Sequence, residues 1–171
     1  MSMEHKAFEF DWQFFKTDFL TILHNALASN DVVPLHSYIE ENVRFLVDPY
    51  EGEPLNLDWR TQVENVHDVH TLGDFAITRF YDPIKDFGIG SAWLDCGDCL
   101  THSSQAALLG QTVGPSFNPF DPGKMGSYFQ SPDEVSQSFE LLSKSDNSLT
   151  IEYLSFLRSC LARQSGLYVT F

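Results

Sequence analysis

The order of apolar and polar residues near the N-terminus predicts a strand followed by two helices. Residues 8–14 alternate aromatic and polar side chains, which is typical of a β-strand. From Asp11 onward the apolar residues recur three and four positions apart, which predicts a helix that Asp11 caps and that ends at residues 30–31. A second short helix is expected over 34–41, because it would carry proline in its first turn.

Four later stretches alternate again and predict β-strands. They lie at 42–48, 57–63, 75–81 and 89–95, and Gly, Pro and Asp residues separate most of them. Strands that short turns connect pair antiparallel, so we expect a meander of about four to five strands with one solvated face.

The C-terminal part of the chain predicts helices around a long irregular connection. A short helix is expected at 103–109, and Pro, Gly and aromatic residues over 110–131 indicate a long loop that packs down. Residues 131–134 read Ser-Pro-Asp-Glu, a capping box that predicts a helix burying Val135, Phe139 and Leu142. A last helix should run from Ser148 to near Gly166, and 167–171 should add a short strand to a sheet edge.

These elements predict an α+β fold, with an antiparallel sheet packed against N-terminal and C-terminal helices. We expect one domain over 1–171, with an acidic α+β part at 1–100 and a near-neutral loop and helical part at 101–171. Its opening, a helix, Asn30-Asp31, a Pro34-led helix and then Asn42-Val-Arg-Phe-Leu-Val-Asp48, resembles the nuclear transport factor 2-like cone fold. The resemblance covers residues 12–49 and implies a fold that small isomerases, cyclases and binding modules share. It transfers no catalytic residue.

The overall charge excludes several classes of partner. The 171 residues include 24 Asp and Glu against 10 Lys and Arg, which gives a net charge of −14 and a pI near 4.5. Nucleic acids and anionic membranes are therefore not expected partners, because both bind through Lys and Arg. No apolar run is long enough to span a bilayer, and an apolar content of 43% is too high for a disordered chain.

Most of the negative charge lies in the first hundred residues. Residues 1–100 hold 18 acidic and 6 basic side chains, whereas residues 101–171 hold 6 and 4. Two interpretations remain open: a solvated face that keeps the protein soluble, or an anionic surface for a cationic partner.

Cysteine usage and the N-terminal sequence both predict a cytoplasmic protein. The three cysteines, Cys96, Cys99 and Cys160, show no disulfide framework, and no secretory signal precedes them. Cys96 and Cys99 have the spacing of a zinc knuckle, with His102 nearby as a third ligand. Incidental thiols, a metal site and a redox pair are all compatible with this group, although the neighbouring Asp95 and Asp98 would raise a thiol pKa.

Two histidines form another candidate group. His67 and His70 would share a face only on a helix, where Asp74 could complete a metal site with them. The steps of three from Val63 to Leu72 allow such a helix, although they also describe an ordinary amphipathic face. No phosphate-binding glycine motif and no nucleophile elbow occurs, and no cofactor is expected.

The sequence therefore predicts a small acidic binding protein, although an enzyme remains open. The most concrete form is a bacterial immunity protein, which neutralises a cationic nuclease-type toxin by occluding the toxin's active cleft. Carboxylates interleaved with aromatic side chains predict the partner-binding residues; they are Tyr50, Glu51, Glu53, Asp58, Trp59, Glu64 and Asp68. The alternative is a small enzyme or ligand-binding domain with a pocket under the 110–131 loop, with or without a metal.

Overall fold

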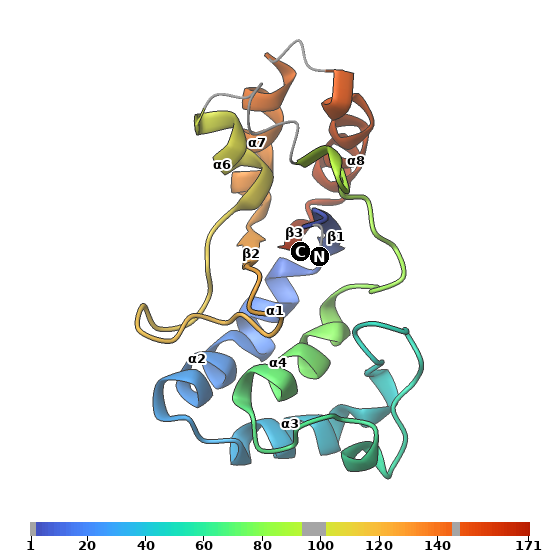
Figure 1. Cartoon of the computed structure of the whole chain (residues 1–171), viewed down its shortest axis with the longest axis vertical. Coiled ribbons are helices and arrows are strands. Elements are labelled where there is room, and N and C mark those ends of the chain that lie inside the picture. Colours follow the sequence, from blue (N-terminus) through green and yellow to red (C-terminus); the bar gives the residue numbers. More distant parts are fainter. Residues whose placement is uncertain (1–2, 94–101, 145–147) are drawn as a thin grey trace. The chain divides into compact units, whose positions relative to one another are not determined.

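The protein is α+β, as predicted. The computed structural model describes residues 3–93, 102–144 and 148–171, with only the backbone described for 102–105 and Leu149. These residues contain seven α-helices and a three-stranded antiparallel sheet. They form two compact units (Figure 1). Unit 1 comprises residues 1–12, 86–112 and 125–171, and unit 2 comprises 13–85 and 113–124, so unit 1 takes segments from both sides of position 100.

The sheet of unit 1 brings the two ends of the described chain together. Strands β1 (Lys6–Phe10) and β2 (Ser127–Gln130) both pair antiparallel with β3 (Gly166–Thr170), in the order β1-β3-β2. Two expectations are therefore wrong: the last strand lies at the centre of the sheet rather than at an edge, and the 110–131 connection contains a strand. The central position gives the β3 backbone hydrogen-bonding partners on both sides. Residues 166–169 can therefore be buried without leaving backbone N–H and C=O groups unpaired.

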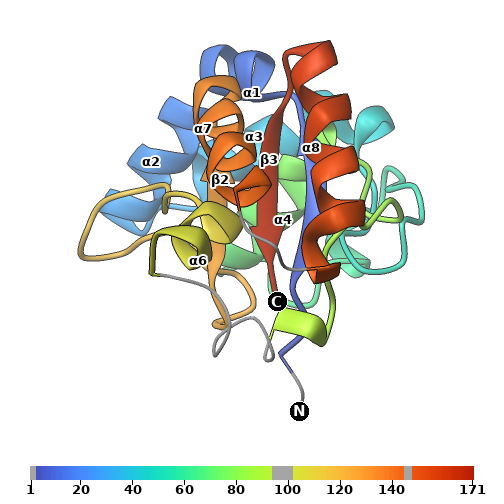
Figure 2. The same ribbon diagram turned by 90° about the horizontal axis from the view of Figure 1, so that it is seen from above.

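Three helices pack with this sheet in unit 1: α6 (His102–Leu109), α7 (Pro132–Ser143) and α8 (Ile151–Arg163) (Figure 2). The predicted capping box is confirmed at the start of α7. The Glu134 N–H donates to the Ser131 hydroxyl at 3.3 Å, and the Ser131 N–H donates to the Glu134 carboxylate at 2.7 Å. The core between these elements is apolar; it includes Ala7, Leu108, Val135, Leu142, Leu157, Cys160, Leu167 and Val169.

The other face of the sheet carries an aromatic cluster. Phe129 stacks on Tyr168 with ring centroids 4.9 Å apart, and Phe10 meets Phe129 edge-on at 5.3 Å. Alternate residues of a strand point to opposite faces, so these rings occupy the face opposite Leu167 and Val169.

Unit 2 is built from α1 (Trp12–Asp18), which belongs to it from Gln13 on, α2 (Leu20–Ser29), α3 (Val33–Asn42) and α4 (Val69–Ile77). The predicted N-terminal helices are confirmed, with an interruption at Phe19 between α1 and α2. Helix α2 ends at Ser29, and the next residue, Asn30, has a φ of 54°, in the left-handed region that closes helices.

The predicted meander is wrong. In the described residues none of its four stretches is a strand, and two of them contribute only an isolated bridge, at Val47 and at Gly90. Residues 43–45 and 59–61 form 3₁₀ turns. Residues 75–77 complete α4, and residues 78–80 form a further 3₁₀ turn directly after it. The strand that the cone-fold resemblance requires after the second helix is absent from these residues. In the 75–81 stretch the helical spacing of Val69, Leu72 and Ala76 outweighs the short-range alternation, and all three residues are buried in α4.

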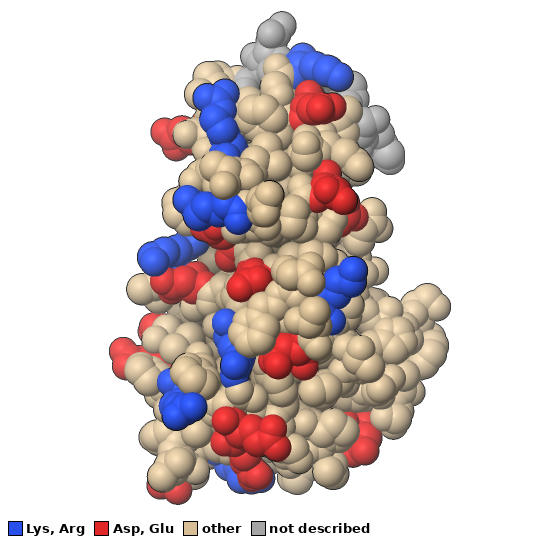
Figure 3. Space-filling view, turned by 180° about the vertical axis from the view of Figure 1, so that it is seen from behind, with Lys and Arg blue, Asp and Glu red and all other residues tan. Residues whose placement is uncertain are grey.

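The net charge is shared equally between the two units. Unit 1 contains 11 acidic and 4 basic residues and unit 2 contains 13 and 6, so each has a net charge of −7. On the face that Figure 3 shows, acidic and basic side chains are interspersed. None of the helices in the described ranges combines the length and apolarity that a bilayer crossing needs.

Candidate functional site

A pocket of about 210 Å³ in unit 2 brings three carboxylates together. Its walls come from the turn after Leu46, from the segment before α4, from α4 itself and from the 113–124 segment. The lining residues are Asp48, Tyr50, Gln62, Glu64, Thr71, Asp74, Phe75 and Pro122.

Asp74 is the buried carboxyl of this pocket. It lies on α4 within the buried run from Leu72 to Thr78 and is only 6% exposed. Burial raises the pKa of Asp74 to about 7, the Asp48 carboxylate adds to this rise, and a hydrogen bond with the Tyr50 side chain opposes it. The Asp74 carboxyl is therefore close to half-protonated at neutral pH, and a nearby cation would favour its ionised form.

Tyr50 is held over the pocket by a tight turn. The backbone N–H groups of Tyr50 and Glu51 both donate to Asp48 Oδ1, at 2.7 and 2.8 Å, and the Asp48 N–H donates to the Glu53 carbonyl at 2.8 Å. Asp48 thus organises the turn with one side-chain oxygen. Gly52 completes it with φ of +71°, a conformation that disfavours residues with a Cβ.

The turn leaves the Tyr50 ring largely in solvent while its hydroxyl reaches Asp74. The residue is 72% exposed. Its pKa is raised to about 12, first by burial of the hydroxyl and then by the hydrogen bond and charge of Asp74. Ile84, which is 70% exposed, lies against Gly52 in the same turn. An exposed ring and an exposed aliphatic side chain therefore stand beside the acidic pocket.

The negative potential of the pocket has no basic counterpart in its walls. None of the described residues that line it is Lys or Arg. Carboxylates in a partly desolvated pocket attract a positive group more strongly than they would in bulk water. A guanidinium or ammonium group matches these acceptors, because it donates several hydrogen bonds at once.

The predicted partner-binding residues divide into two groups in the structure. Tyr50 and Glu64 line the pocket, and Glu51, Glu53 and Asp58 are exposed. The other two have structural positions. Trp59 is 1% exposed, between the His36 ring and the Arg60 guanidinium, and Asp68 caps α4. The Asp68 carboxylate accepts from both the backbone N–H and the hydroxyl of Thr71, each at 2.8 Å.

The two histidines of the alternative site do not converge on a metal. His70 is half-buried and bonds the 113–124 segment with both ring nitrogens: Nε2 meets Asn118 Oδ1 at 3.1 Å, and Nδ1 accepts from the Asp121 N–H at 3.2 Å. His67 is exposed. In the described residues no three His, Cys, Asp or Glu side chains are arranged to hold a metal ion.

The cysteine group lies largely outside the described residues. Cys96 and Cys99 belong to the segment that the structure does not describe, and His102 is described by its backbone alone. The metal and redox interpretations of this group therefore stay predictions. Cys160 is buried, and burial raises its pKa to about 12.

Asp48 and Asp74 form the part of the pocket that the interface prediction missed. A signal for Asp74 was present, since a single carboxylate within the apolar run from Leu72 to Ile77 is expected to be buried. Asp48 precedes Pro49, an arrangement that favours a turn whose backbone N–H groups bond the Asp side chain.

Comparison with protein-family models, with curated proteins and with solved structures found no match to this chain. What the pocket does must therefore be inferred from its own residues and their chemistry.

Proposed function

We propose that this protein is a binding protein that inhibits a cationic protein partner, which it engages through the acidic pocket of unit 2 and the exposed turn beside it. The most concrete partner is a nuclease-type toxin domain, and the protein would then be a cytoplasmic immunity protein that occludes its cleft. One observation carries the proposal: Asp48, Glu64 and Asp74 converge in one pocket with no basic residue in its described walls.

The surroundings of the pocket favour a protein partner over an isolated ion. Tyr50 and Ile84 expose apolar surface next to the carboxylates, and Leu57 is 88% exposed nearby in the sequence. Protein interfaces combine such exposed aromatic and aliphatic anchors with charged groups. A basic side chain of the partner would enter the pocket, while Tyr50 would pack against the surface around that side chain.

The local grouping of carboxylates, and not the net charge, distinguishes this surface. Each unit carries −7, so overall charge supplies long-range attraction without selecting a binding face. The proposal therefore predicts that partner affinity depends on where the negative charge lies.

Affinity purification from the protein's own cells at moderate salt tests the proposal. The tagged wild-type chain should retain a basic protein whose enzymatic activity it suppresses. The triple variant Glu51→Gln/Glu53→Gln/Glu64→Gln should lose about tenfold or more in affinity for that protein. The matched control Glu4→Gln/Asp133→Asn/Glu140→Gln removes the same charge from exposed positions of unit 1 and should bind like wild type.

Three outcomes would contradict this function: recovery of no basic partner, a partner whose activity is unaffected, or equal losses for the two triple variants. The pH dependence gives a further check. Since a bound cation favours ionised Asp74, partner affinity should rise as the pH increases through 7 and should do so less in Asp74→Asn.

A second candidate function is acid–base catalysis, which the raised pKa of Asp74 favours. A buried carboxyl with a pKa near 7 is suited to accept and return a proton at neutral pH. Pro122, from the 113–124 segment, is one of the residues that line this pocket, which supports this candidate. An enzyme would lose turnover in Asp74→Asn even at saturating substrate, whereas an inhibitor would bind its partner more weakly and still suppress it fully at saturating concentration.

A further inference from the structure

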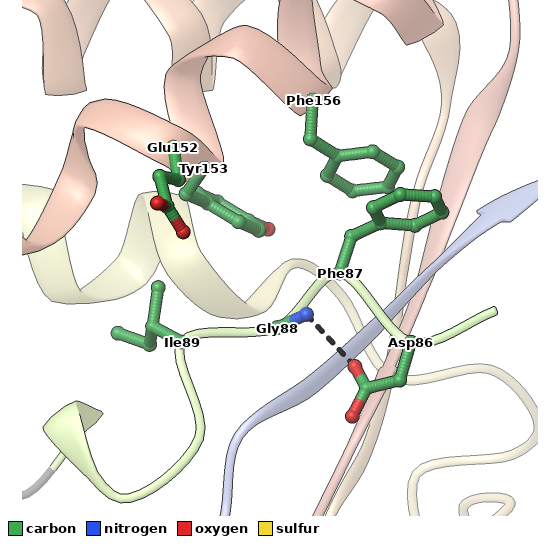
Figure 4. Close-up of a pocket in the computed structure, with 7 residues that line it drawn as sticks. All are labelled: Asp86, Phe87, Gly88, Ile89, Glu152, Tyr153 and Phe156. Carbon is green, nitrogen blue, oxygen red and sulfur yellow. Dashed lines mark hydrogen bonds between the residues drawn. The ribbon is translucent and has the colours of Figure 1, made fainter.

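Unit 1 contains a second pocket that the proposed function does not use. Its volume is about 320 Å³, within the range of small-molecule sites. One wall is the 86–89 segment, which runs beside β1, and the other is the first part of α8 (Figure 4). The Phe87 N–H donates to the Ala7 carbonyl at 2.8 Å, so β1 holds this segment in place.

A buried hydroxyl in this pocket has no hydrogen-bond partner. Tyr153 is 1% exposed, and in the described part of the chain its hydroxyl is one of two buried side-chain atoms without a partner. Its ring extends from α8 toward the 87–88 segment, with the hydroxyl leading (Figure 4). An unsatisfied buried hydroxyl is costly, so its presence in a cavity points to a missing hydrogen-bonding group.

The neighbouring polar side chains are already engaged. The His5 ring packs edge-on against Tyr153 with centroids 5.6 Å apart, and its Nε2 lies 2.8 Å from the Leu108 carbonyl. The other nitrogen, Nδ1, accepts from the Ile89 N–H at 3.3 Å. Asp86 Oδ1 accepts from the N–H groups of Ala7 and Gly88. None of these described groups hydrogen-bonds the Tyr153 hydroxyl.

The pocket combines an aromatic wall with negative charge. Phe87 stacks on Phe156 at 4.5 Å with planes 10° apart, and Phe87 keeps 47% of its surface exposed. Asp86 and Glu152 are both lining residues, and none of the described lining residues is basic. The Glu152 carboxylate makes no hydrogen bond or ion pair in the described residues. An anionic ligand is therefore disfavoured, and a cation with an apolar body is favoured.

We propose that this pocket binds a small organic amine that carries a hydroxyl group on a ring-sized apolar body. The ammonium group would bind Glu152, the body would pack on Phe87, and the hydroxyl would bond Tyr153. The inference is independent of the proposed function, because it concerns other residues in the other unit.

Titration of the full-length protein with four related probes, followed by calorimetry and NMR, tests each part. Tyramine has the ammonium, the ring and the hydroxyl. Phenethylamine lacks the hydroxyl, tyrosol replaces the ammonium with a neutral hydroxyl, and 4-hydroxyphenylacetate reverses the charge. Tyramine should bind saturably, about fivefold tighter than phenethylamine and about tenfold or more tighter than tyrosol, and the anion should not bind.

Two variants assign these differences to residues. Tyr153→Phe should reduce the ratio of tyramine to phenethylamine affinity to about one, because both probes then lack a hydroxyl partner. Glu152→Gln should remove most of the preference for tyramine over tyrosol. Neither variant should unfold, since Tyr153→Phe only deletes the unsatisfied hydroxyl and Glu152 is exposed.

Controls in both units locate the site. Glu140→Gln, an exposed acid of α7, and Asp74→Asn in unit 2 should both bind tyramine like wild type. The proposal is overturned if tyramine shows no saturable binding, if tyrosol binds as tightly, or if the Tyr153→Phe ratio stays at the wild-type value. It is also overturned if Asp74→Asn, rather than Glu152→Gln, abolishes tyramine binding. These measurements need no protein partner, so they can fail while the inhibitor function holds.

Discussion

The two pockets differ in how they treat a buried polar side chain. Each has one polar group that is almost completely buried on a helix: Asp74 on α4 and Tyr153 on α8. In unit 2 a turn brings the Tyr50 side chain onto Asp74, so the buried group has a partner within the chain. In unit 1 no described side chain or backbone group meets the Tyr153 hydroxyl.

This difference shows how a buried polar group can be related to function. Asp74 has its own hydrogen bond, and what remains unbalanced around it is negative charge, which favours a cation from outside. Tyr153 lacks the hydrogen bond itself, which favours a ligand with a matching polar group. Net charge does not separate the two pockets, because both units carry −7.

The largest expected effect is the loss of a pH dependence in Asp74→Asn. Folding raises the pKa of Asp74 from 3.8 to about 7, so between these values the folded state binds one proton more than the unfolded state. The stabilisation is complete below about pH 4 and is lost as the pH rises through 7, by about 4 kcal/mol at most. Urea unfolding at several pH values should show this loss in wild type relative to Asp74→Asn.

The matched control for this pH profile is Asp58→Asn, which alters an exposed carboxyl of the same unit and should keep the wild-type profile. Parallel profiles for wild type and Asp74→Asn would mean that Asp74 ionises normally in the folded protein. The contrast between the two pockets would then be lost.

A second large effect is expected where the unit 1 pocket is attached to the sheet. A Cβ on Gly88 would overlap the His5 carbonyl oxygen and lie 2.6 Å from Lys6 Cα, and both atoms belong to the backbone. Gly88→Ala should therefore destabilise the protein by about 3 kcal/mol and abolish tyramine binding. Gly123→Ala is the control, because its Cβ would meet no atom within 4 Å. Equal stability of the two variants in urea unfolding would show that the 86–89 segment is not held against β1.

The helices could be predicted because their signals are local. The capping box at Ser131 and the helix end at residues 30–31 depend on residues within one turn of the helix, and both are confirmed. The strands depend on pairing between distant segments. Phe8 lies opposite Tyr168 in the sheet, a separation that no local pattern encodes. The meander was wrong because alternation over four to seven residues also occurs in turns and short helices.

The candidate sites could be predicted only in part, for the same reason. The interleaving of carboxylates with aromatic residues pointed to Tyr50 and Glu64, which do line the unit 2 pocket. It could not distinguish them from Trp59, whose burial depends on the His36 and Arg60 side chains around it. Tyr153 could not be predicted as a site residue, because an absent hydrogen bond leaves no trace in a sequence.

Tyr50→Phe should destabilise the protein by about 2 kcal/mol at pH 8, where Asp74 is mostly ionised. The variant removes the hydroxyl that bonds a buried carboxylate, and an unsatisfied buried acceptor carries its full desolvation cost. The ring itself is largely exposed, so little packing is lost. The pKa of Asp74 should also rise further, since the Tyr50 hydrogen bond lowers it. NMR titration of the Asp74 carboxyl would detect this shift, and an unchanged pKa would contradict the pairing.

The same substitution in unit 1 should have the opposite sign and the smallest magnitude. Tyr153→Phe deletes a hydroxyl that has no partner, so the ligand-free protein should gain about 1 kcal/mol in its free energy of unfolding. Saturating tyramine should cancel this difference, because the roughly fivefold tighter binding that the Tyr153 hydroxyl provides adds about 1 kcal/mol to wild type alone. Urea unfolding of both proteins with and without tyramine measures the two differences together. A loss of stability in the ligand-free variant would mean that the hydroxyl is already satisfied, and Tyr153 would then resemble Asp74 instead of contrasting with it.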